Sequence, residues 1–150
     1  MHEKKNSINV VLVDDDAEDR EFFQEVVEEL PYEVALTTYK NGQEFIDGLI
    51  QNKDLLPDLV FLDLNMPIKN GIQSLKEVRQ MEEFKKIPII AIYYTSISPE
   101  DKADTFHLGA DAYISKPNDY RELKMLISKI FEMDWKNRST NKANFIITPI

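Results

Sequence analysis

The regular alternation of short apolar runs with longer amphipathic stretches is the feature that most constrains this fold. Five runs are short enough to be strands and end at polar or turn-forming residues: 8–13, 33–39, 59–62, 89–94 and 112–115. The stretches between and after them repeat apolar residues at helical spacing: 19–30, 43–51, 71–84, 99–109 and 119–133. Short, continuously apolar runs are typical of strands buried on both faces of a parallel sheet. The pattern therefore predicts an α/β doubly wound sheet of five parallel strands.

This topology brings polar side chains that are far apart in the sequence to one place. Right-handed crossovers put the carboxyl ends of all the strands at one edge of the sheet, which is where open α/β sheets bind ligands. The side chains expected there are Asp14, Asp15 and Asp16 after the first strand, Asp63 after the third, Thr95 and Ser96 after the fourth, and Lys116 after the fifth.

The combination of these groups indicates phosphoryl chemistry. Standing alone, Asp63 would be read as capping the turn at Met66-Pro67, as Asp often does. The three consecutive acids Asp14–Asp16, however, repel one another unless a cation neutralises them. Mg²⁺ suits such oxygen ligands, and no Asp-x-Asp-x-Asp-Gly loop points to Ca²⁺ instead. With Lys116 and a strand-end hydroxyl to meet an anion, the set describes an aspartyl-phosphate site.

Three motifs in order give a specific resemblance. Val13-Asp14-Asp15, then Leu62-Asp63-Leu64-Asn65-Met66-Pro67 with Gly71, then Lys116-Pro117, resemble the motifs of a response-regulator receiver domain of the chemotaxis-regulator kind. The resemblance covers about residues 8 to 133. It implies a flavodoxin-like (βα)5 fold and a single-domain response regulator of a two-component or phosphorelay system.

The resemblance also implies a role for each residue of the site. Asp63 would accept a phosphoryl group from a histidine kinase or phosphotransfer protein, and Lys116 would hold the phosphoryl oxygens. Asp14 and Asp15 would share one Mg²⁺ with Asp63, Asp15 being the more direct ligand, and the backbone carbonyl of Asn65 would complete its shell. Members of the family are phospho-acceptors that catalyse their own phosphorylation and dephosphorylation, so no turnover enzyme is expected.

The fourth strand departs from the family pattern. Receivers carry a Thr or Ser there that moves toward the phosphoryl group, but the expected place falls on Tyr93 or Tyr94, depending on the direction of counting. We choose Thr95 for the switch hydroxyl, with Ser96 as the alternative. Tyr113 matches an aromatic that receivers use as a rotamer switch, although an aromatic in a fifth strand also serves plain packing. The bond between Lys116 and Pro117 is often cis in the family.

Two other classes of protein remain as alternatives. A phosphatase of the haloacid dehalogenase type also uses a strand-end Asp with Mg²⁺, but it needs a second Asp two residues on, where this chain has Asn65. Its nucleophile also usually follows the first strand rather than the third. A pseudo-receiver that is never phosphorylated would act only through protein interactions. The complete set of Asp14, Asp15, Asp63 and Lys116 argues against it, while the two tyrosines in strand 4 favour it.

Composition restricts the partners and the location. A net charge of −9, from 18 basic and 27 acidic residues, argues against nucleic-acid binding and against an anionic membrane surface. The absence of Cys, of a signal peptide and of a membrane-spanning apolar run fits a cytoplasmic protein. We expect a flexible N-terminus (1–7), one receiver domain (8–133) and a C-terminal tail (134–150), to which we assign no structure. The tail is too short to fold alone as an output domain, so we expect a stand-alone switch with an unknown downstream protein partner.

Overall fold

A single parallel sheet with helices on both faces forms the protein. The computed structural model describes residues 7–66, 69–93 and 99–149. The strands are β1 (Ser7–Val13), β2 (Glu33–Tyr39), β3 (Leu59–Asp63), β4 (Ile89–Tyr93) and β5 (Ala112–Ser115). The helices are α1 (Ala17–Glu29), α2 (Gly42–Gln51), α3 (Gly71–Gln80), α4 (Pro99–His107) and α5 (Tyr120–Phe131), with a 3₁₀ turn η1 (Glu82–Phe84) after α3.

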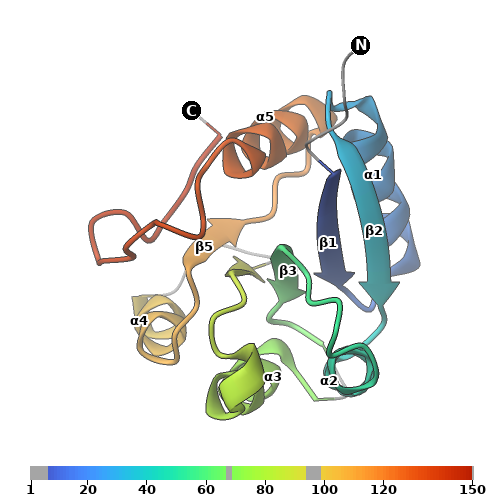
Figure 1. The fold of residues 1–150 in the computed structure, drawn as a ribbon. Helices are drawn as coiled ribbons and strands as arrows, with labels where there is room; N and C mark the ends of the chain where they lie inside the picture. Colours follow the sequence, from blue (N-terminus) through green and yellow to red (C-terminus); the bar gives the residue numbers. More distant parts are fainter. Residues whose placement is uncertain (1–6, 67–68, 94–98, 150) are drawn as a thin grey trace.

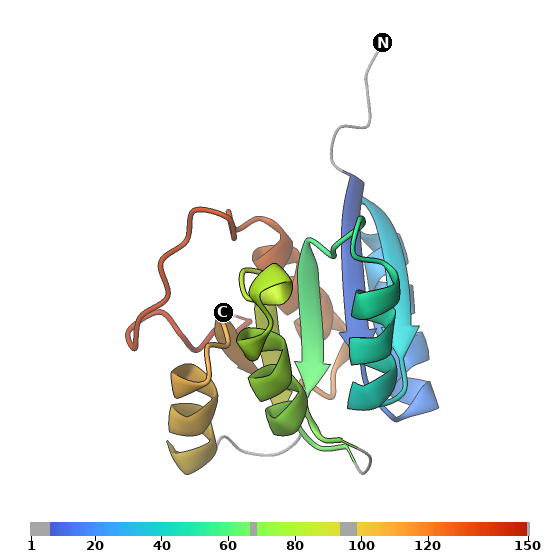
Figure 2. The same ribbon diagram turned by 60° about the horizontal axis from the view of Figure 1, so that its bottom comes forward.

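The predicted architecture is confirmed. The strands pair in parallel in the order β2-β1-β3-β4-β5, so their carboxyl ends share one edge. Helices α1 and α5 cover one face of the sheet, and α2, α3 and α4 lie on the other (Figures 1 and 2). The expected third helix is divided, because α3 ends at Gln80 and only a 3₁₀ turn continues toward Phe84. The fourth strand is described as far as Tyr93, and Tyr94, where the sequence analysis ends it, lies outside the described residues.

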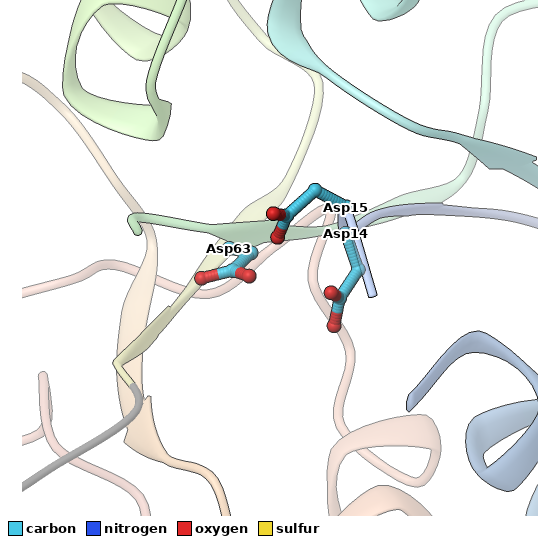
Figure 3. A group of neighbouring side chains, drawn as sticks. All are labelled: Asp14, Asp15 and Asp63. Carbon is cyan, nitrogen blue, oxygen red and sulfur yellow. The ribbon is translucent and has the colours of Figure 1, made fainter. Parts of the chain in front are cut away.

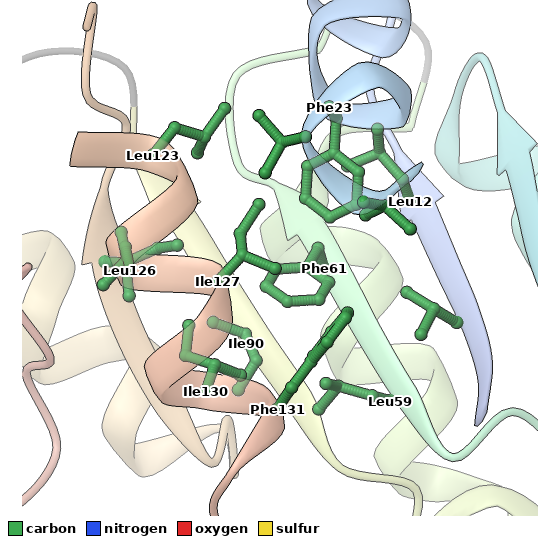
Figure 4. Close-up of a cluster of buried hydrophobic side chains, with 14 of the residues drawn as sticks. Leu12, Phe23, Leu59, Phe61, Ile90, Leu123, Leu126, Ile127, Ile130 and Phe131 are labelled. Atoms are coloured by element: carbon green, nitrogen blue, oxygen red, sulfur yellow. The ribbon is translucent and has the colours of Figure 1, made fainter. Parts of the chain in front are cut away.

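Alternating side chains of the central strands build two separate cores. In β1, Val10 and Leu12 point to the core beneath α1 and α5, whereas Val11 and Val13 point to the core beneath α2 and α3. Period-two alternation across a sheet that is covered on both faces explains why the strands are apolar at every position. Figure 4 shows the first of these cores, in which Phe61 of β3 lies between the two helices.

Helix starts close to the strand ends hold the edge of the sheet in place. Asp16 is the N-cap of α1, where its side chain accepts the N–H groups of Glu18 (2.8 Å) and Asp19 (3.2 Å). Asn70 and Gln73 form a reciprocal capping box at the start of α3. Gly71, the first residue of α3, lies against the chain that carries Asp63: a Cβ at this position would come within 2.4 Å of the carbonyl oxygen of Asp63. Only glycine permits this approach.

The C-terminal segment 134–149 packs against the free edge of β5, although the sequence analysis assigns it no structure. The N–H of Tyr113 donates to the carbonyl of Phe145 (2.9 Å), and the N–H of Ile147 donates to the carbonyl of Tyr113 (3.2 Å). Phe145 and Ile147 are 1% and 5% exposed and belong to the two cores. The Phe145 ring lies 5.8 Å from that of Tyr113 and 5.2 Å from that of Phe106 in α4. The segment thus covers an edge that would otherwise present unpaired backbone groups.

Side chains fix the turn of this segment to the body of the protein. Arg138 and Thr140 both donate to the carbonyl of Asp111, at 3.0 and 3.1 Å. The Arg138 guanidinium also lies over the Trp135 ring, 4.8 Å from its centroid, and Lys129 of α5 donates to the carbonyl of Thr148 (3.0 Å). Among the described residues, no helix is long and apolar enough to cross a membrane.

The burial of Phe145 predicts that the C-terminal segment stabilises the domain. Phe145→Ala should lower the free energy of unfolding by about 3 kcal/mol, because it removes a buried aromatic ring and leaves a cavity. Thr148→Ala, at an exposed position of the same segment, should change it by less than about 0.5 kcal/mol. Urea denaturation monitored by circular dichroism measures both variants. Equal stability of Phe145→Ala and wild type would show that the segment is not part of the folded core.

Candidate functional site

Three carboxylates meet at the carboxyl edge of the sheet. Asp14 and Asp15 follow β1, Asp63 ends the neighbouring strand β3, and one oxygen from each lies within 4.8 Å of the other two. Asp14 and Asp63 are each 1% exposed, whereas Asp15 is exposed to solvent. Figure 3 shows the three side chains converging from the two strand ends. They lie together because β1 and β3 are neighbouring parallel strands whose carboxyl ends share one edge of the sheet.

Asp63 is the carboxylate with unused acceptor capacity. Its Oδ1 accepts the backbone N–H of Asn65 at 2.9 Å. Its Oδ2 is buried and has no hydrogen-bond partner among the described residues. A buried carboxylate oxygen without a partner is costly, so this atom marks a place where an external group would bind.

Asp14 and Lys116 form an ion pair beside Asp63. The Lys116 Nζ donates to Asp14 Oδ2 (2.6 Å) and to Asp19 Oδ2 (2.8 Å). The other oxygen of Asp14 accepts the N–H of Asp16 (3.0 Å), and its carbonyl accepts from Arg20 Nη1 (2.8 Å). Lys116 is itself 15% exposed, so its ammonium is largely shielded from water. The site therefore holds two buried carboxylates and one positive charge close to both.

Burial controls the acidities in this cluster. Burial raises the pKa of Asp63 to about 7, and the negative charge of Asp14 adds to this effect, while the N–H of Asn65 and the charge of Lys116 oppose it. Burial also raises the pKa of Asp14, although the hydrogen bond from Lys116 lowers it in part. Burial lowers the pKa of Lys116, but the hydrogen bonds to Asp14 and Asp19 outweigh it, so the pKa is raised overall and the ammonium stays charged at neutral pH.

The carboxylate cluster fits a hard divalent cation. Its donors are oxygens only, as Mg²⁺ and Mn²⁺ require, and the buried Asp63 Oδ2 is available. Exposure of Asp15 leaves one side of the cluster open to the waters that Mg²⁺ keeps in its shell. Burial is the main cause of the raised pKa of Asp63, and a cation there would oppose both this effect and the added repulsion from Asp14.

The structure brings most of the predicted site residues to one edge of the sheet. Asp14, Asp15 and Asp63 come together as predicted. Lys116 reaches the same edge, where its ammonium is paired with Asp14 and Asp19. Asn65 follows Asp63 directly and its side chain is exposed; its carbonyl as a metal ligand stays a prediction.

The fourth-strand prediction is not tested here. Thr95, Ser96 and Tyr94 lie outside the described residues. Tyr113 is fully buried and packs against Phe145, so in this structure its ring turns inward. No peptide bond in the described part of the chain is cis, and the Lys116-Pro117 bond is accordingly trans, the form that X-Pro bonds usually prefer.

Two residues of α1 contribute to the site and are absent from the sequence analysis. Asp19 contacts Lys116, and Arg20 contacts the Asp14 carbonyl. The position of the N-cap was the available signal: with Asp16 as the cap, Asp19 is the third helical residue and stays close to the end of β1.

Comparison with known proteins identifies relatives of the whole domain. The family model described as "Response regulator receiver domain" matches residues 10–128. The chain is 36% identical over 117 residues to the transcriptional regulatory protein CiaR of Streptococcus pneumoniae, matching 69% of this chain and 51% of CiaR. It is 28% identical over 148 residues to the response regulator Rcp1 of Synechocystis, matching 95% of this chain and 99% of Rcp1. The chain thus spans about half of CiaR, and only 15% of the sensor histidine kinase CheAY of Helicobacter pylori.

Solved structures of similar proteins share the fold. The Mn²⁺-bound form of Rcp1 superposes with a TM-score of 0.75 at 25% identity, covering 89% of this chain and 99% of that one. The phosphorylated cyanobacterial phytochrome response regulator RcpA gives a TM-score of 0.78 at 28% identity, covering 89% and 97%. One relative was therefore solved with a divalent metal and another in a phosphorylated form.

The raised pKa of Asp63 predicts how stability depends on pH. Its folded pKa of about 7 lies above the unfolded value of about 3.9, so between these values the folded state binds the extra proton. The wild type should therefore lose stability as pH rises from about 4 to about 7, and Asp63→Asn should lack the part of this loss that the Asp63 carboxyl causes. The stability advantage of Asp63→Asn should be larger at pH 8 than at pH 5 in urea denaturation without divalent cations.

The exposed Asp54 provides the control for this experiment. Asp54→Asn removes one negative charge from the surface, and its stability relative to wild type should differ little between the two pH values. An advantage of Asp63→Asn that is the same at both pH values would contradict the raised pKa of the Asp63 carboxyl.

Proposed function

This chain belongs to the response regulator receiver domain family, which works in phosphorylation-based two-component signalling, and we propose that it is a single-domain response regulator with Asp63 as the phospho-acceptor. The phosphoryl donor is a histidine kinase or a phosphotransfer protein. The match over nearly the whole length of Rcp1 supports the single-domain form, and the placement of the four site residues supports the acceptor role.

The observation that carries the proposal is the buried, unpartnered Oδ2 of Asp63. This oxygen lies at the carboxyl edge of the sheet, among charged groups that are suited to a phosphoryl group. The other oxygen of the same carboxylate, Oδ1, accepts the N–H of Asn65, so the carboxylate is oriented before the phosphoryl donor binds. Orientation of the reacting atoms is the main contribution a protein makes to phosphoryl transfer.

The transfer itself exchanges one bond to phosphorus for another. The Asp63 carboxylate attacks the phosphorus of a phosphohistidine, a P–O bond forms, and the P–N bond breaks with its electron pair leaving on the imidazole, which takes up a proton. Asp63 must be ionised to attack, and its pKa of about 7 leaves a substantial fraction ionised at neutral pH. Lys116 leaves the Asp14 carboxylate and pairs with the phosphoryl oxygens, where its charge opposes the added negative charge.

Mg²⁺ is the cation we assign to Asp14, Asp15, Asp63 and the carbonyl of Asn65. When bound, it supplies positive charge to the phosphoryl oxygens and lowers the pKa of Asp63. The donor set of carboxylate oxygens supports this assignment. The Mn²⁺ in the structure of Rcp1 is consistent with a divalent ion in this position.

The consequence of phosphorylation is a change in protein binding. We assign the chain the role of a phospho-acceptor and not of a turnover enzyme, with one downstream protein that distinguishes its two states. A strand-4 hydroxyl, which we place at Thr95, meets the phosphoryl group, and the β5 side chain Tyr113 responds to its movement. The phosphoryl group favours one arrangement of these residues through its differential contacts.

Replacement of Asp63 tests the acceptor role. Incubation with acetyl phosphate and Mg²⁺, followed by intact-mass measurement, should add the mass of one phosphoryl group to the wild type. Asp63→Asn should gain none, because the amide is isosteric but not nucleophilic. Chelation of Mg²⁺ by EDTA should reduce the adduct in wild type.

Asp54→Asn, in an exposed position away from the site, is the matched control and should be phosphorylated like wild type. An undiminished mass gain in Asp63→Asn would move the acceptor to another residue. Absence of an adduct in wild type would favour the pseudo-receiver alternative.

A further inference from the structure

The Lys116 ammonium is shared between two carboxylates, of which only one belongs to the carboxylate cluster. Its Nζ lies 2.6 Å from Asp14 Oδ2 and 2.8 Å from Asp19 Oδ2. Asp14 is a member of the cluster of Asp14, Asp15 and Asp63, whereas Asp19 is not. Lys116 therefore bridges the candidate metal site, through Asp14, and the first turn of α1, through Asp19.

A divalent cation and Lys116 compete for Asp14. The cation needs the oxygens of Asp14, and an ammonium on the same carboxylate repels it at short range. If the cation took Asp14 from Lys116, an ammonium on a side chain that is only 15% exposed would lose its shorter ion pair, and the loss of a partner from a buried pair is destabilising. Cation binding therefore costs less free energy if Lys116 keeps its ion pair with the second carboxylate, Asp19.

The position of Asp19 suits it to be that second carboxylate. Its backbone N–H is held by the Asp16 cap (3.2 Å), which fixes the start of α1 relative to β1. Its side chain is 23% exposed, so its charge is less screened than that of a free surface acid. A cavity of about 340 Å³ borders Asp14, Asp19 and Lys116, which leaves the ammonium room to shift from one carboxylate toward the other.

We propose that Asp19 is a positioning residue for divalent-cation binding: it retains Lys116 when the cation occupies Asp14. This inference rests on the proposed metal site, and it adds to the site a residue that does not contact the cation. It also means that the effect of Asp19 on the cation is transmitted through Lys116 and not through its own charge alone.

Titration with MgCl₂ followed by NMR of the backbone amides tests the inference. Asp19→Asn should raise the Mg²⁺ dissociation constant about fivefold or more, in the range typical of coupled neighbouring residues. Glu18→Gln is the matched control, because it removes one negative charge from the adjacent, exposed position, and among the described residues Glu18 forms neither a hydrogen bond nor an ion pair with Lys116. It should raise the constant less than about twofold, since exposed charges are screened by salt.

A double-mutant cycle separates transmission through Lys116 from a direct charge effect. In a Lys116→Met background there is no ammonium to retain, so Asp19→Asn should then change the dissociation constant no more than Glu18→Gln does. Asp19→Glu, which keeps a carboxylate on the same turn, should restore the affinity to within about twofold of wild type. Thermal melts establish that each variant is folded, and Asp19→Ser replaces Asp19→Asn if the latter does not fold.

Each outcome bears on a different part of the account. Equal effects of Asp19→Asn and Glu18→Gln, or an effect of Asp19→Asn that persists without Lys116, overturn the role of Asp19 while leaving the metal site in place. The metal site itself is checked with Asp15→Ala, which should lose most of its Mg²⁺ affinity because few protein oxygens remain. Failure of wild type to bind Mg²⁺ would overturn both the metal assignment and the role of Asp19.

Discussion

The repulsion between two buried carboxylates of like charge is the constraint to which the whole site responds. Asp14 and Asp63 are each 1% exposed and lie in one cluster, a pairing that is unfavourable in a medium of low polarity. The parallel sheet forces it, because β1 and β3 are neighbours and end at the same edge. Lys116, the N–H of Asn65 and the N–H of Asp16 offset this cost only in part. The pKa of Asp63 is still raised, first by burial and in addition by the charge of Asp14. Such a carboxylate cluster favours the binding of a cation, and the bound cation in turn favours an anion such as a phosphoryl group.

Features of the structure that follow from local sequence pattern and from topology can be predicted from the sequence. Apolar runs and helical spacing give the five strands and the helices, and parallel pairing then brings Asp14, Asp15 and Asp63 together. The ion pair between Lys116 and Asp19 is not predictable in this way, because it depends on the exact angle at which α1 leaves β1. That angle is set by the Asp16 cap, and it decides whether Asp19 faces the site or solvent.

The packing of the C-terminal segment 134–149 against β5 could not be predicted from the sequence either. Residues 134–144 are mostly polar, and the short run Phe145-Ile146-Ile147 has no periodicity that marks a strand. Its burial depends on the free edge of β5, to which it contributes two backbone hydrogen bonds at Tyr113. The segment lies beyond the residues that the family model matches. It nevertheless packs against Tyr113, the aromatic residue that we propose responds to phosphorylation. A movement of the Tyr113 ring would therefore change its contact with Phe145.

Chemical identification of the phosphorylated residue tests the central claim most directly. An acyl phosphate, unlike a phosphate ester, is reduced by borohydride, so an aspartyl phosphate is converted to homoserine at the acceptor position. After phosphorylation with acetyl phosphate and Mg²⁺, reduction and proteolysis, mass spectrometry of the peptides should find homoserine in place of Asp63 and aspartate unchanged at Asp14 and Asp15. Homoserine at either of those two positions, or a phosphate that survives reduction, would contradict the account.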